Sequence, residues 1–104
     1  MTMSRSKHTG AQTIDPTTTG AITGTQLEKR KQRRVTLRTT EADAITTDPT
    51  ITLEASVDGD TWIAVDSATG TEITLTNPIP DAYVRANVTS AADAGTLTMW
   101  IAAL

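Results

Sequence analysis

Length and composition restrict this chain to a single small domain. It has 104 residues, no Cys, no Phe, and only three aromatic side chains, two Trp and one Tyr. A core with so few large side chains is thin, and domains of this size are often stabilised by oligomerisation. The absence of Cys excludes disulfides, thiolate nucleophiles and thiolate metal sites.

The net charge of -3 is unevenly divided along the chain. Residues 1–34 hold seven Lys or Arg against two carboxylates, a net of +5, whereas residues 35–104 hold two Arg against ten carboxylates, a net of -8. Such a contrast indicates that a basic segment and an acidic body meet different surroundings, or that the segment of one copy lies on the body of another.

No stretch reaches the roughly 20 apolar residues that a bilayer span needs. The first ten residues, MTMSRSKHTG, also lack the apolar core of a signal peptide. We therefore expect a protein that is made in a host cytoplasm and has no membrane partner.

Residues 1–34 are predicted to form a flexible, basic, Thr- and Gly-rich arm, and residues 35–104 the folded domain. Up to about residue 26 the arm is almost entirely small and polar, with isolated Ile14 and Ile22. This composition buries too little apolar area to offset the entropy lost on ordering. We expect an extended strap in which Ile14 and Ile22 contact a partner, and whose backbone adds to the sheet edge of another chain.

The predicted arm ends in a cationic segment, LEKRKQRR at positions 27–34, which is too short for a stable isolated helix. It has no aromatic side chains for base stacking and no rigid base-reading element, and the acidic body would repel nucleic acid. An acidic protein surface, including another copy of this chain, is therefore favoured over packaged nucleic acid, with a solvated linker as the alternative. The candidate partner-binding residues of this segment are Lys29, Arg30, Lys31, Arg33 and Arg34.

After residue 34 the hydrophobic pattern has a period of two, which is typical of half-buried strands. Strands are predicted over 34–40, 50–58, 61–65, 72–76, 82–89 and 96–104. Asp58-Gly59 predicts a tight hairpin between the second and third of them, and prolines at 78 and 80 end the fourth.

The expected fold class is therefore all-β, a small antiparallel sandwich or barrel of about six strands. Its predicted core is Leu53, Val57, Trp62, Leu75, Val84, Val88, Leu97, Met99 and Ile101.

Two motifs in the body resemble short β-sandwich modules of tailed-bacteriophage virion proteins. One is an S-x-DG-x-x-W hairpin and the other a YVR-x-x-V strand, followed by a final hydrophobic strand. The matching residues are Ser56, Asp58, Gly59 and Trp62, then Tyr83, Val84, Arg85 and Val88. The resemblance covers roughly residues 50–102 and leaves the arm unexplained.

What the resemblance implies is a virion structural protein without catalysis, assembled as a homo-oligomer, often a trimer or ring, on capsid or other virion subunits. We expect a capsid decoration or cement protein held by its N-terminal arm. A tail or connector accessory protein and a carbohydrate-binding module are the alternatives.

No constellation in the sequence predicts catalysis, a cofactor or a metal. The single His8 lies in the predicted arm without an orienting partner. Asp58, Asp60 and Asp66 are near enough in sequence to consider a calcium site, but Asp beside Gly is ordinary turn chemistry. Trp62 and Trp100 could stack on sugars, although a thin core needs their area.

Tyr83 and Arg85 alternate on one strand opposite Val84 and Val88, so both are expected to point away from the core. Tyr and Arg are favoured anchors of protein interfaces. A subunit interface is therefore predicted at Tyr83 and Arg85, with a solvated face as the alternative.

Overall fold

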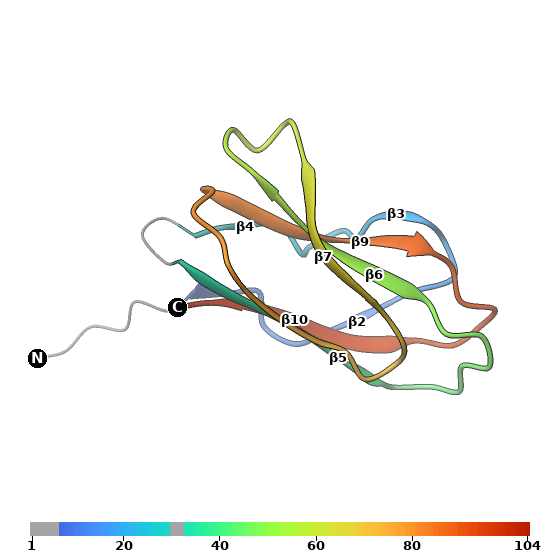
Figure 1. Ribbon diagram of the computed structural model, residues 1–104. Helices are drawn as coiled ribbons and strands as arrows, with labels where there is room; N and C mark the ends of the chain where they lie inside the picture. The colour runs from blue at the N-terminus through green and yellow to red at the C-terminus, as the bar shows by residue number, and fades with distance from the viewer. Residues whose placement is uncertain (1–6, 30–32) are drawn as a thin grey trace, which may run out of the picture.

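The computed structural model describes residues 7–29 and 33–104, which form ten strands in two antiparallel sheets packed as a sandwich (Figure 1). The first sheet has the order β1-β10-β5-β8, with β2 also paired to β10, and the second has the order β3-β9-β6-β7, with β4 also paired to β9. The strands are β1 (Lys7–His8), β2 (Gln12–Ile14), β3 (Gly20–Ala21), β4 (Leu27–Glu28), β5 (Arg34–Glu41), β6 (Thr50–Ser56), β7 (Ile63–Thr69), β8 (Thr74–Pro78), β9 (Tyr83–Ser90) and β10 (Leu97–Ala103). The predicted all-β sandwich is confirmed, and β5 to β10 correspond to its six predicted strands. No helix of the described residues is long and apolar enough to cross a membrane.

The core lies between the sheets and follows the alternation in the sequence. Along β10, positions 97, 99, 101 and 103 are buried and those between them are half-buried. The buried hydrophobic residues are Ile14, Val35, Leu37, Ile51, Leu53, Ala55, Ile73, Leu75, Ile79, Val84, Ala86, Val88, Ala92, Leu97, Met99, Ile101 and Ala103.

Two members of the predicted core are not in it. Val57 is 77% exposed because β6 ends at Ser56 and the chain leaves the sandwich there. Trp62 is half-buried and lies with its ring against the guanidinium of Arg85.

The N-terminal segment differs most from the sequence-based expectation. Residues 7–29, here called the strap, pair with strands of their own chain instead of extending away from it. Strands β1 and β2 pair with β10, and β3 and β4 pair with β9. A composition-based argument misses this because strands of two or three residues add to a preformed sheet edge through backbone hydrogen bonds and need little apolar area of their own.

The strap seals one side of the sandwich. Without it, β9 and β10 would be the edge strands there, and open edges invite pairing with other chains. The two halves of the strap are also joined, because the Gln12 side chain donates a hydrogen bond of 3.0 Å to the Thr23 carbonyl. On the opposite side the edges are β7 and β8, which are linked by a 2.9 Å hydrogen bond from Asn77 to Asp66.

Candidate interaction surfaces

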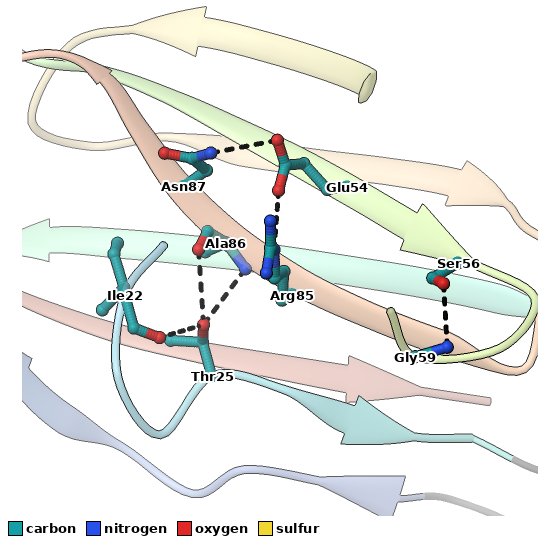
Figure 2. A network of polar contacts seen from close by, with 8 residues as sticks. All are labelled: Ile22, Thr25, Glu54, Ser56, Gly59, Arg85, Ala86 and Asn87. Atoms are coloured by element: carbon teal, nitrogen blue, oxygen red, sulfur yellow. Dashed lines mark hydrogen bonds and ion pairs between the residues drawn. The ribbon is translucent and has the colours of Figure 1, made fainter. Parts of the chain in front are cut away.

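Buried Thr25 fastens the strap to β9 at the point where the strap leaves the ladder between β3 and β4. Its hydroxyl donates to the Ile22 carbonyl at 2.7 Å and accepts from the Ala86 amide at 3.1 Å (Figure 2). Thr25 is fully buried, so water cannot replace these partners. Thr9 does the same for β10, where it accepts from the Ile101 amide at 3.1 Å. The Thr-rich composition of the strap thus has a structural use.

Thr25→Val is expected to lower the free energy of unfolding by about 2 kcal/mol, because it leaves the buried amide of Ala86 without its acceptor and removes one of the two hydrogen bonds to the Ile22 carbonyl. Chemical denaturation measures the change. Thr25→Ser keeps the hydroxyl and should lose less than half as much, and exposed Thr23→Val is a neutral control. Equal losses in the valine and serine variants would show that the hydroxyl has no such role.

A polar cluster with one aromatic ring lies on the outer face of the second sheet, across β6 and β9. Glu54 accepts from Arg85 Nε at 2.7 Å and from Asn87 Nδ2 at 3.0 Å (Figure 2). The guanidinium carbon of Arg85 lies 4.2 Å from the ring centroid of Trp62. The side chains of Arg85 and Glu54 are only 24% and 13% exposed, so the cluster is a partly desolvated patch whose side chains are held in place by their contacts.

Tyr83 lies at the end of the same strand and points to the same outer side. Its hydroxyl donates to Glu28 of the strap at 3.1 Å, and its ring packs on Gly59. This bond and the negative charge of Glu28 raise the pKa of Tyr83. The outward orientation predicted for Tyr83 and Arg85 is what the structure shows, and their role in a subunit interface stays a prediction.

The connection between β6 and β7, residues 57–62, is longer than the tight two-residue turn expected from Asp58-Gly59. Asp58 organises it by accepting from the amides of Asp60 and Thr61, both at 2.9 Å, and from the Ser56 hydroxyl. Ser56 in turn accepts from the Gly59 amide at 2.8 Å (Figure 2). Within residues 7–29 and 33–104, no three His, Asp or Glu side chains lie together as a metal site.

The hydrogen bonds that Asp58 accepts from the Thr61 and Asp60 amides and from the Ser56 hydroxyl lower its pKa from 3.8 to about 2. A carboxyl with a depressed folded-state pKa stabilises the fold above its unfolded pKa, and this stability is lost as the pH falls towards the folded value. Asp58→Asn should therefore be less stable than the natural protein above about pH 4, with a difference that shrinks between pH 4 and pH 2. Thermal unfolding at several pH values measures this, and a difference independent of pH would contradict it.

An apolar hollow lies on the outer face of the first sheet, beside the strap. It is open, has a volume of about 510 Å³, and is lined by His8, Gly10, Ala11, Trp100, Ala102 and Leu104. Sugar sites combine an aromatic face with several converging polar groups. The hollow offers one imidazole side chain among small and apolar residues, which suits a protein surface better than a sugar.

The predicted partner-binding residues of the first 34 positions are in different environments. Ile14 is in the core and Ile22 packs against it, so the described structure does not present them to a partner. Lys29 is completely buried; burial lowers its pKa, while the charge of Asp81 acts in the opposite direction. Arg33 and Arg34 are exposed, and Arg30 and Lys31 lie outside the described residues.

Sequence reasoning missed the hollow because its lining comes from both ends of the chain. Antiparallel pairing brings the strap residues His8 to Ala11 next to the outward side chains of β10. A two-residue strand such as β1 has no sequence pattern from which this pairing could be predicted. The one signal in the sequence was Trp100 at a position alternating with buried Met99 and Ile101.

The fold is shared along its whole length with a protein derived from a prophage. The crystal structure of the SPBc2 prophage-derived protein YomS is similar to this chain with a TM-score of 0.65, covering 99% of this chain and 97% of that one at 14% sequence identity. At this identity the likeness establishes the fold alone. No family model matches the sequence, and no curated protein sequence matches it.

Proposed function

We propose that this protein is a non-enzymatic structural component of a tailed-phage particle, and that it binds the capsid exterior as a decoration or cement protein. The observation that carries the proposal is the end-to-end similarity to a prophage-derived protein, which covers 99% of this chain and 97% of that one. The S-x-DG-x-x-W and YVR-x-x-V motifs point the same way. A function based on surfaces also fits the geometry, because the notable features are an outer-face cluster and an open hollow.

Attachment through the strap would require residues 7–29 to leave β9 and β10 and to withdraw Ile14 from the core. We therefore place attachment on the outer faces of the folded domain. The Trp62–Arg85–Glu54 patch contains Trp and Arg, two of the residue types that dominate protein interfaces, and Glu54 holds Arg85 in position before binding. Many copies on one particle would make even weak contacts effective.

The direct test uses phage particles from the strain that encodes this chain, made with and without its gene. The purified protein is added back to the deficient particles, sedimented with them and located by electron microscopy. Regular density on the outside of the capsid is the expected result. Density in the tail or connector would replace the capsid assignment, and absence from complete particles would overturn the proposal.

Arg85→Ala and Glu54→Ala in the added protein should both weaken particle binding if the cluster is the attachment site. Exposed Ala94→Asp, in the turn between β9 and β10, is the matched surface control.

A further inference from the structure

The hairpin of residues 57–62 projects beyond the sandwich (Figure 1). Val57 in the hairpin and Ile63 directly after it have exposed apolar side chains. Val57 continues the core-facing series of β6, and Ile63 is paired with core residue Ala55, yet they are 77% and 58% exposed. Both line a small hollow of about 170 Å³ that also contains Asp58 and Asp81. The hairpin is thus an apolar projection with two carboxylates, Asp58 and Asp81, beside its exposed side chains.

The hollow on β10 has the opposite charge at its border. Arg38 is paired with Trp100 in the register of β5 and β10, which places both side chains on the outer face. Arg34 and Leu104 exchange two backbone hydrogen bonds of 3.1 and 2.8 Å, so this exposed arginine lies beside the exposed end of the hollow. The apolar floor, which includes His8, therefore lies on the same outer face as Arg34 and Arg38. The exposed Arg38 side chain leans towards β8, where its Nη1 lies 3.4 Å from Thr74 Oγ1.

We propose that the 57–62 hairpin of one copy docks in the Trp100–Leu104 hollow of a second copy. Val57 and Ile63 would cover apolar area in the hollow, and Asp58 and Asp60 would face Arg38 and Arg34. The inference deepens the proposed function and rests on it for the setting of many copies side by side on one particle.

The carboxylates of the hairpin and the arginines near the hollow have opposite charges, which favours a second copy of this chain as the occupant of the hollow. The same charges determine how the copies associate. Two hairpins would bring carboxylates together, and two hollows would bring guanidinium groups together, so neither surface is suited to its own kind. A contact between two different surfaces leaves each copy with one free hairpin or one free hollow. Association of this type continues until it closes into a ring or forms a row.

The test is the solution mass of the full chain at low salt, measured by sedimentation at up to about 1 mM, the range of weak contacts. Val57→Asp blocks the hairpin and Leu104→Asp blocks the hollow, and both sites are exposed enough to leave the fold intact. Each variant alone should be monomeric, with association weakened at least about 30-fold, as for loss of one hot-spot side chain. Ala94→Asp, in an exposed turn, should associate like the natural protein.

Mixing the two variants is decisive, because one still has an intact hollow and the other an intact hairpin. The mixture should form a complex of two copies and nothing larger. A monomeric natural protein, or a variant that still associates alone, would overturn the proposal. Self-association without particle binding would instead overturn the proposed function and leave this contact standing.

Charge exchange gives an independent check. Arg38→Glu and Asp60→Lys should each weaken association, and the double variant should recover most of the loss, because every contact then joins a new lysine to a new glutamate. Failure to recover would argue against this pairing of surfaces.

Discussion

Replacing Gly95 with alanine is expected to lower the free energy of unfolding by about 3 to 4 kcal/mol, measured by chemical denaturation. Gly95 has a φ of +92°, a conformation that strains any residue with a Cβ. A Cβ there would also overlap the Ala44 carbonyl and lie 2.6 Å from Cγ1 of Ile45. The loop cannot easily yield, because Asp93 accepts from the amides of Thr46 and Thr47 at 3.1 and 2.9 Å.

Gly10→Ala separates backbone strain from overlap. Gly10 has a φ of +77°, but nothing lies within 4 Å of the place that an alanine Cβ would occupy. The Gly10→Ala variant should lose only about 1 kcal/mol of unfolding free energy, which is the cost of the backbone strain alone. Similar losses at both glycines would show that the 42–49 loop does not pack on the β9–β10 turn as described.

Ile14→Ala should cost about 3 kcal/mol of unfolding free energy, the usual loss for removing a large aliphatic side chain from a core. Ile14 is 5% exposed and is paired with Leu97 of β10, inside the same cluster as the main strands. The prediction distinguishes a strap that is part of the sandwich from a free arm, since replacing an isoleucine in a free arm would hardly change stability.

Neighbouring Thr13 is the matched control, because it is exposed on the same short strand. Thr13→Ala should change stability by less than about 0.5 kcal/mol, as is usual for surface sites. Ile14→Val should fall between the two, at about 1 kcal/mol. A loss below about 1 kcal/mol in Ile14→Ala would mean that the strap does not contribute to the core.

The six longer strands could be predicted from the sequence because alternation and turn residues are local signals. TITLEAS and LTMWIAA alternate between core-facing and outward residues, and the structure places them as β6 and β10. Boundaries were less accurate: the third strand was predicted over 61–65 and is observed as Ile63–Thr69, because the Asp58 side chain closes a longer turn.

The strap could not be predicted in the same way because its stability is non-local. Ile14, Ile22 and Thr25 look like isolated residues in a polar stretch, and they become useful only where β9 and β10 offer an open edge. The charge contrast between residues 1–34 and 35–104 could be read from the sequence. The sequence did not show that Lys29 is buried beside Asp81, or that Arg34 lies by the β10 hollow. Surface complementarity needs the register of β5 with β10, which no single stretch contains.

Hydrogen exchange in a monomeric sample tests most directly the claim that residues 7–29 belong to the sandwich of their own chain. The amides of Thr9, Ile22 and Lys29 bond to the carbonyls of Ile101, Ala86 and Ala82 at 3.0, 2.9 and 2.8 Å. We predict that these three amides are protected to a degree comparable with the central amides of β9 and β10. Exchange at the rate of an unfolded chain, with β9 and β10 still protected, would contradict the account and restore the free arm.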